Sequence, residues 1–261
     1  MLETLQRPSW VDGVVRRGRV AFAALLIGGG LVLGFSHYES FARLQSVQVE
    51  GADHAGQAAI RHLADLSLGE SLFLIDTQRS LDQVAAHPWV KHVELSRKLS
   101  GDVLISVEEH QSALLLATHK GLYRVSPTGQ IFVRARGGGL DQVLLTGLSP
   151  ELLDQQGPLS QRIISDSLAV LVRVDSSSAI SRDDLSELHF DPLLGFSLLM
   201  RNGTEIRIGY LPPDQAITRL DMMVQRSLDL SEPTLVDLDL DGLALATPLA
   251  ALRSVPGTPP S

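Results

Sequence analysis

The chain has 261 residues and contains no cysteine. Disulfides, thiolate catalysis and zinc–thiolate sites are therefore excluded. The eight histidines show neither an H-x-x-x-H nor an H-E-x-x-H spacing, which disfavours zinc. The sequence also lacks S-x-x-K and a P-loop lysine, and Ser197 lies in GFSLL, without the second glycine of a nucleophile elbow. These absences favour a protein that binds other molecules, and we assign it no catalytic residue, metal or cofactor.

Charge is missing from one run, residues 20–36, in which nine residues are Leu, Ile, Val or Phe. A spanning helix needs about 17 to 25 apolar residues. The run therefore predicts a transmembrane helix over 20–37. Because arginines remain on the cytoplasmic side, Arg16, Arg17 and Arg19 predict that residues 1–19 form a cytoplasmic tail.

Two other readings of this run are less consistent with its composition. Three consecutive glycines, 28–30, disfavour a buried helix of a soluble core. No A-x-A-like site follows, which disfavours a cleaved signal peptide. Gly30 and Gly34 form a G-x-x-x-G, a weak motif for pairing of membrane helices.

The part of the chain that follows the predicted membrane helix carries a net negative charge. The tail carries four arginines and two acids, a net of +2, and subtracting this from the total of −8 leaves about −10 for the rest. An acidic body with a pI near 5.4 does not suit nucleic acid.

The next segment, to about residue 107, predicts a strand, two helices and a hairpin. Alternation predicts a strand over 46–51, and helical spacing predicts a helix within 54–70. A second helix is expected over 77–86, with Asp76 as its N-cap and Pro88 after its end. Apolar residues alternate with polar ones on both sides of a turn at 100–102, and this pattern predicts the hairpin.

The remainder predicts a mixed β domain with flanking helices. Short strands are expected over 114–117, 122–125, 131–133, 143–146, 185–190, 196–200 and 205–208, and helices over 157–174 and 212–230. The Asn202-Gly203 pair is a strong hairpin signal. A last strand is expected over 234–248, with Val236, Leu238 and Leu240 on one face and Leu235, Asp237, Asp239 and Asp241 on the other. The same aspartates match half of an EF-hand loop, but Pro248 stands where its twelfth residue, Glu, is required, which disfavours calcium.

Four motifs of the first domain share their order and spacing with one family. They are V-x-V-x-G at Val47–Gly51, G-x-x-L-F-x-x-D at Gly69–Asp76, H-P-W-V at His87–Val90 and I-x-V-x-E at Ile105–Glu109. This pattern resembles the POTRA domain of the FtsQ/DivIB cell-division proteins. The resemblance implies an α+β chain with one N-terminal transmembrane helix, a POTRA domain of β-α-α-β-β order over 45–114 and a distal β domain over 115–248. Residues 249–261, rich in proline and serine, are expected to be disordered.

The resemblance also implies a binding site near the end of the chain. In the family the terminal strand region receives FtsB of the FtsB–FtsL pair, and its matching residues here are Val236, Asp237, Leu238, Asp239, Leu240, Gly242, Leu243 and Ala244, with Arg219 and Tyr210. Asp239, Leu240 and Tyr210 depart from the family's usual Arg, Tyr and Arg. A strand near a sheet edge presents unpaired N–H and C=O groups, to which an extended partner can add as a new strand.

The function implied by the resemblance is a non-enzymatic scaffold of the bacterial division machinery. It would lie in the inner membrane at the septum, with its domains in the periplasm, and link early division-ring proteins to septal peptidoglycan synthesis. It would bind an FtsB/FtsL-like pair, and other division proteins through the POTRA domain, but no small-molecule substrate. Two alternatives are a POTRA-containing component of secretion or outer-membrane assembly and a membrane-anchored periplasmic hydrolase, which would require a pocket of convergent polar groups.

Overall fold

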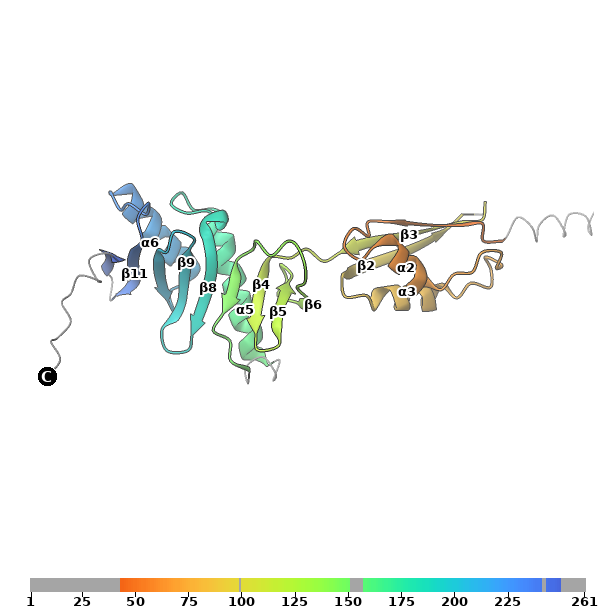
Figure 1. Cartoon of the computed structure of the whole chain (residues 1–261), viewed down its shortest axis with the longest axis horizontal. Coiled ribbons are helices and arrows are strands. Elements are labelled where there is room, and N and C mark those ends of the chain that lie inside the picture. The colour runs from red at the N-terminus through yellow and green to blue at the C-terminus, as the bar shows by residue number, and fades with distance from the viewer. Residues whose placement is uncertain (1–42, 99, 151–156, 241–242, 250–261) are drawn as a thin grey trace, which may run out of the picture. The chain divides into compact units, whose positions relative to one another are not determined.

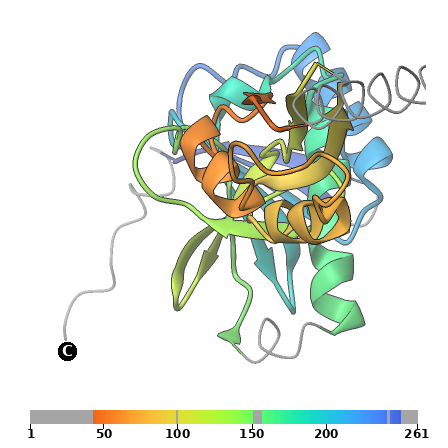
Figure 2. The same ribbon diagram turned by 90° about the vertical axis from the view of Figure 1, so that its right-hand side faces the viewer.

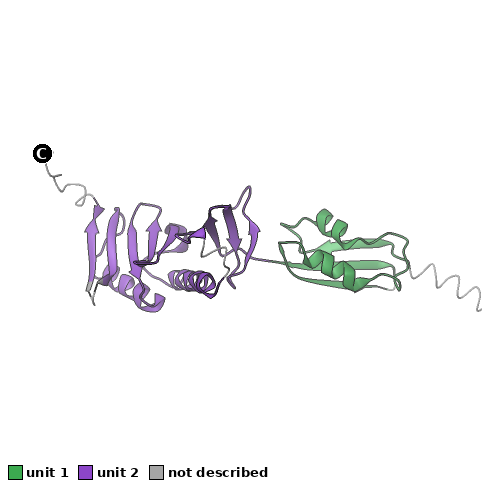
Figure 3. Ribbon diagram, turned by 90° about the horizontal axis from the view of Figure 1, so that it is seen from below, with its two compact units in different colours: residues 1–109 green, residues 110–261 purple. Residues whose placement is uncertain are grey.

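The computed structural model describes residues 43–98, 100–150, 157–240 and 243–249. The predicted tail, the membrane helix with Gly30 and Gly34, and nearly all of the C-terminal tail lie outside these residues. Within the described ranges, no helix has the length and hydropathy needed to cross a membrane. The chain divides into two compact units, residues 1–109 and 110–261 (Figure 3).

The first unit has the predicted β-α-α-β-β order (Figure 1). Its elements are β1 (Ser46–Glu50), α2 (Gln57–Ala64), α3 (Thr77–Ala85), β2 (Val90–Arg97) and β3 (Asp102–Glu109). The sheet order is β1-β3-β2, in which β3 pairs in parallel with β1 and antiparallel with β2. Both helices cover one face of this sheet (Figures 1 and 2).

Local sequence accounts for these elements. Asp76 is the N-cap of α3, as predicted, because its carboxylate accepts a hydrogen bond from the Arg79 N–H at 3.1 Å. Ile60 and Val84 bury one side of each helix against Val103 and Ile105 of β3. The helical spacing therefore predicted both helices correctly.

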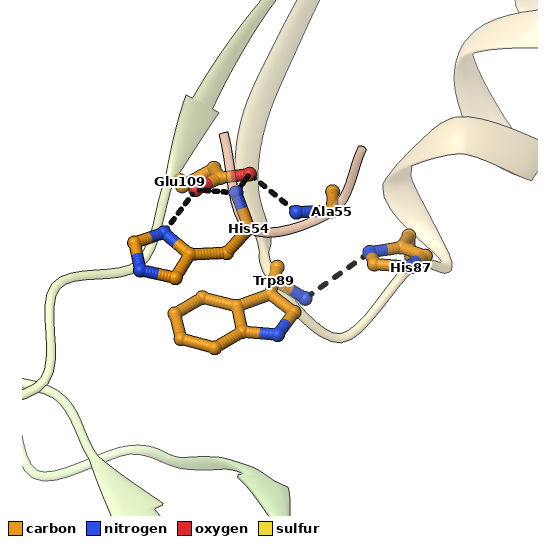
Figure 4. A network of polar contacts seen from close by, with 5 residues as sticks. All are labelled: His54, Ala55, His87, Trp89 and Glu109. Atoms are coloured by element: carbon orange, nitrogen blue, oxygen red, sulfur yellow. Dashed lines mark hydrogen bonds and ion pairs between the residues drawn. The ribbon is translucent and has the colours of Figure 1, made fainter. Parts of the chain in front are cut away.

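A carboxylate at the end of β3 holds the segment that enters α2 (Figure 4). Glu109 accepts hydrogen bonds from the backbone N–H groups of His54 and Ala55, at 2.9 and 2.7 Å, and its other oxygen lies 2.8 Å from His54 Nδ1. The His54 ring stacks on Trp89 with centroids 4.3 Å apart. Partial burial opposes ionisation of Glu109, but the hydrogen bonds from Ala55 and His54 outweigh it and lower the pKa below the ordinary 4.5.

We expect Glu109→Gln to lower the free energy of unfolding of this unit by about 1 kcal/mol at pH 7, because an amide oxygen accepts these bonds less strongly. Since the folded-state pKa is lowered, the carboxylate stabilises the fold above pH 4.5. That contribution disappears as pH falls through the lowered pKa, so the two proteins should converge in acid. Urea unfolding followed by Trp89 fluorescence, in a Trp10→Phe background, measures this difference.

Glu108→Gln is the matched control, because Glu108 is exposed and pairs with Lys91 at 2.5 Å on the surface. It should change stability by less than about 0.5 kcal/mol. Equal effects of the two substitutions at pH 7 would contradict the role given to Glu109.

The second unit is built on a mixed nine-stranded sheet among the described residues, with strand order β12-β11-β10-β9-β8-β7-β4-β5-β6. The strands are β4 (Leu114–Thr118), β5 (Gly121–Val125), β6 (Ile131–Arg134), β7 (Leu144–Thr146), β8 (Leu185–Asp191), β9 (Gly195–Met200), β10 (Glu205–Gly209), β11 (Thr234–Leu240) and β12 (Leu243–Pro248). The helices are α5 (Pro158–Val174), a 3₁₀ turn η1 (Arg182–Asp184) and α6 (Pro213–Gln225). Helix α6 ends five residues before the predicted Leu230.

The helices α5 and α6 lie against one face of this sheet (Figure 3). Their buried residues, such as Val170, Leu171, Ile217 and Leu220, share one core with alternate residues of the strands. Most intervening strand residues are half-buried or exposed, but Leu115 of β4 and Arg124 of β5 are buried, so the opposite face of the sheet is covered at these two strands.

Candidate partner-binding edge

The last segment of the chain forms two antiparallel strands, β11 and β12, where a single strand over 234–248 was predicted. That prediction is wrong. The signal that it missed is Asp241-Gly242, a dipeptide typical of two-residue hairpin turns, between two apolar runs. Residues 241–242 themselves lie outside the described residues.

The strand at the edge of the sheet is β12, and β11 is interior. Val236 of β11 is in register with Ile206 of β10 on one side and with Ala246 of β12 on the other. The main chain of β11 is therefore paired on both sides through this stretch, and among the described residues the open backbone row belongs to β12.

One hydrogen bond shows which backbone N–H and C=O groups of β12 point away from β11. Leu249 N–H donates to the Pro233 carbonyl at 3.0 Å, so residues 233 and 249 form a hydrogen-bonded pair. Hydrogen-bonded and non-hydrogen-bonded pairs alternate in an antiparallel ladder. The next bonded pairs are then Leu235 with Thr247 and Asp237 with Leu245, which leaves the N–H and C=O of Ala246 directed toward the free edge.

Side chains near this edge divide between core and surface. Val236 and Leu238 are fully buried in the core of the unit. On the other face Asp237 is half-buried and Asp239 is exposed, and the side chain of Leu245, opposite Asp237, is 56% exposed. The edge thus presents an acidic surface next to an exposed leucine.

Arg219 and Tyr210 fix the end of β11 from two neighbouring elements. Arg219 of α6 donates through Nη1 to the Leu238 carbonyl at 2.8 Å. The Tyr210 hydroxyl donates to the Pro192 carbonyl at 2.7 Å, and the Tyr210 N–H lies 3.4 Å from the Asp239 carboxylate. The structure therefore brings together four of the predicted residues: Tyr210, Arg219, Leu238 and Asp239.

A glycine makes this approach possible. Gly209 has φ +66°, and a Cβ there would lie 1.9 Å from the Asp239 carboxylate. Its freedom of conformation lets the chain turn after β10 while Asp239 packs directly against the backbone. Of the other predicted residues, Leu240 and Leu243 are partners in the backbone register, Ala244 is exposed on β12, and Gly242 lies outside the described residues.

One groove in the same unit has a volume of about 410 Å³ and lies between α5 and the segment that precedes α6. Its lining is mainly apolar, and its charged residues, Arg162 and Asp166, face each other at 3.9 Å. The described residues contain no cluster of three histidine, aspartate or glutamate side chains placed to hold a metal ion.

Comparison with known proteins gives one consistent result. Residues 42–110 match the family model described as "POTRA domain, FtsQ-type". The chain is 30% identical over 205 residues to the cell division protein FtsQ of Anaeromyxobacter sp. (strain K), covering 77% of this chain and 68% of that protein. It is 25% identical over 226 residues to FtsQ of Geobacter sp. (strain M21), covering 86% and 82%. The corresponding protein of Myxococcus fulvus is 28% identical over 201 residues, covering 75% and 69%.

Proposed function

The chain belongs to the FtsQ family of cell division proteins, and from this membership we propose that it is a non-enzymatic scaffold that recruits an FtsB/FtsL-like pair. A role in the division machinery follows from the family itself. The proposal adds that the protein lies in the inner membrane at the septum and links early division-ring proteins to septal peptidoglycan synthesis.

The observation that carries the recruitment is the open backbone edge of β12. An extended segment of the partner would add beside β12, bonding to the free N–H and C=O of Ala246. Main-chain pairing of this kind tolerates the departures at Asp239, Leu240 and Tyr210, because the backbone supplies much of the affinity. Pro248 has no N–H, which limits how far the added strand extends.

The other predicted residues would contribute in two different ways. Val236, Leu238 and Arg219 hold the strand pair in place from the core side, and Tyr210 anchors its far end. The backbone of Leu243 and Ala244 in β12 would lie directly beside the incoming chain, while Asp237 and Asp239 of β11 lie one strand further in, on the side of the sheet away from the core. A basic residue on the partner would suit the acidic side of this edge.

The predicted helix over 20–37 would confine both units to the membrane plane beside their partners and so raise the effective concentration. The first unit offers a further contact, since β1 and β2 are both edges of its sheet.

The test is capture of the partner from membranes. We expect the full chain, tagged at its N-terminus and solubilised in mild detergent, to retain the FtsB/FtsL-like pair encoded in the same genome. Depletion of the chain should then remove both partners from mid-cell and produce filaments. Normal septal localisation of the pair after complete depletion would contradict the proposal.

A further inference from the structure

Three large apolar side chains protrude from the connection between α2 and α3 in the first unit. Leu68, Phe73 and Leu74 are 69%, 60% and 78% exposed. The same connection is anchored in the core by two buried residues, Leu72, which lies between Leu68 and Phe73, and Ile75, which follows Leu74. Single exposed apolar residues are ordinary on a protein surface, but three on one short connection form an apolar tip.

The tip is held against the beginning of the described chain. The Leu44 N–H donates to the Glu70 carbonyl and the Gly69 N–H donates to the Leu44 carbonyl, both at 2.8 Å. Arg43 Nη1 also donates to the Gly69 carbonyl at 3.1 Å. Figure 1 shows the α2–α3 connection at the end of this unit where the described chain begins.

Basic side chains surround the tip on the side of the β2–β3 hairpin. Arg97 Nη1 donates to the Leu72 carbonyl at 2.9 Å, and the Gln45 N–H donates to Gly101 of the hairpin at 2.8 Å. Arg43, Arg97 and Lys98 are all exposed. Two acids lie nearby: Glu70 is half-buried, and Asp102 accepts hydrogen bonds from the hydroxyls of Ser46 and Ser100 at 2.6 and 2.7 Å.

Chain length places this end of the unit near lipid. The predicted membrane helix ends at residue 37, six residues before Arg43. Six residues extend at most about 20 Å. If the helix spans the bilayer, the apolar tip and its basic surroundings therefore remain within reach of the headgroups, whatever the path of the intervening residues.

We infer that Leu68, Phe73 and Leu74 insert into the periplasmic face of an anionic bilayer, while Arg43, Arg97 and Lys98 contact lipid phosphates. Apolar side chains partition into the headgroup boundary, and neighbouring cations are attracted to anionic lipid. This second contact would fix the orientation of the first unit on the membrane, which a single flexible tether does not do. The inference rests on the proposed membrane helix.

The absence of cysteine allows a direct test, because one introduced thiol can be labelled uniquely. The full chain carrying Leu74→Cys, labelled with an environment-sensitive fluorophore, is reconstituted in phosphatidylethanolamine/phosphatidylglycerol vesicles that contain nitroxide lipids. Leu193→Cys is the matched control, since Leu193 is an exposed leucine (88%) between β8 and β9 of the second unit.

We expect nitroxide lipids to quench the label at position 74 at least about threefold more strongly than the label at 193. Replacing Arg43, Arg97 and Lys98 with glutamine should reduce that difference. Equal quenching at the two positions, in protein that floats with the vesicles, would overturn the inference and leave the membrane helix intact. Failure to float with vesicles would overturn the membrane helix and the inference together. A label at 74 that becomes shielded only when the FtsB/FtsL-like pair is added would overturn the lipid contact and assign the tip to a protein partner.

Discussion

Replacing Leu238 with lysine is expected to unfold the second unit, with a loss of about 4 kcal/mol or more in the free energy of unfolding. Leu238 is fully buried among the residues that pack between the sheet and the two helices. A lysine there would bury an ammonium group among apolar side chains, and an unpaired buried charge is expensive. Pulse proteolysis of the full chain in increasing urea measures the effect. The fragments released show when the second unit is cleaved.

The matched control is Leu245→Lys on the neighbouring strand. Leu245 is 56% exposed and faces Asp237 across the ladder, so the same substitution places an opposite charge beside an acid at the surface. We expect it to change stability by less than about 0.5 kcal/mol. Similar urea midpoints for the two variants would show that the inner face of β11 is not part of the core.

Because Leu238→Lys is expected to unfold the second unit, a charged residue at 238 is unsuitable for testing partner binding. Loss of the fold would remove binding for an unrelated reason.

Ala246→Pro is expected to weaken binding of the FtsB/FtsL-like pair at least about tenfold, while the fold loses about 1 kcal/mol or less. Proline removes the N–H that Ala246 directs toward the free edge and places its ring where an added strand would approach. The bonds between β12 and β11 are made by the neighbouring residues, so the strand pair itself should survive.

Ala246→Ser is the control for this variant, because it enlarges the side chain by one polar atom and keeps the N–H. Titration of the full chain in nanodiscs with the purified pair gives both affinities. We expect near-native binding for the serine variant. Equal affinity of the proline and serine variants would mean that the pair does not use the backbone of β12.

Local sequence patterns predicted the elements whose contacts are close in the chain. The hairpin at Asn202-Gly203 formed as predicted: β9 and β10 pair antiparallel, Gly203 has φ +91°, and its N–H donates to the Met200 carbonyl at 3.0 Å. Helix α5 begins at Pro158 because proline suits the first turn, where its missing N–H is not required. In these places composition and turn chemistry act over a few residues.

Sheet order in the second unit could not be predicted in the same way. Strand β7 lies between β4 and β8 through two parallel pairings, and the residues that pair, such as Leu145 with Leu188, are far apart in the sequence. No local signal encodes such a choice of neighbour. The edge was misplaced for a different reason: the turn signal of Asp241-Gly242 was overlooked, so the second strand of the hairpin was merged with the first.

The most direct test of strand addition at β12 is amide hydrogen exchange of the full chain with and without the FtsB/FtsL-like pair. The account predicts that exchange of the Ala246 N–H slows at least about tenfold in the complex, because a new hydrogen bond forms there. Exchange in β6, at the other edge of the same sheet, should not change. Formation of a stable complex with unchanged exchange at Ala246 would contradict the account.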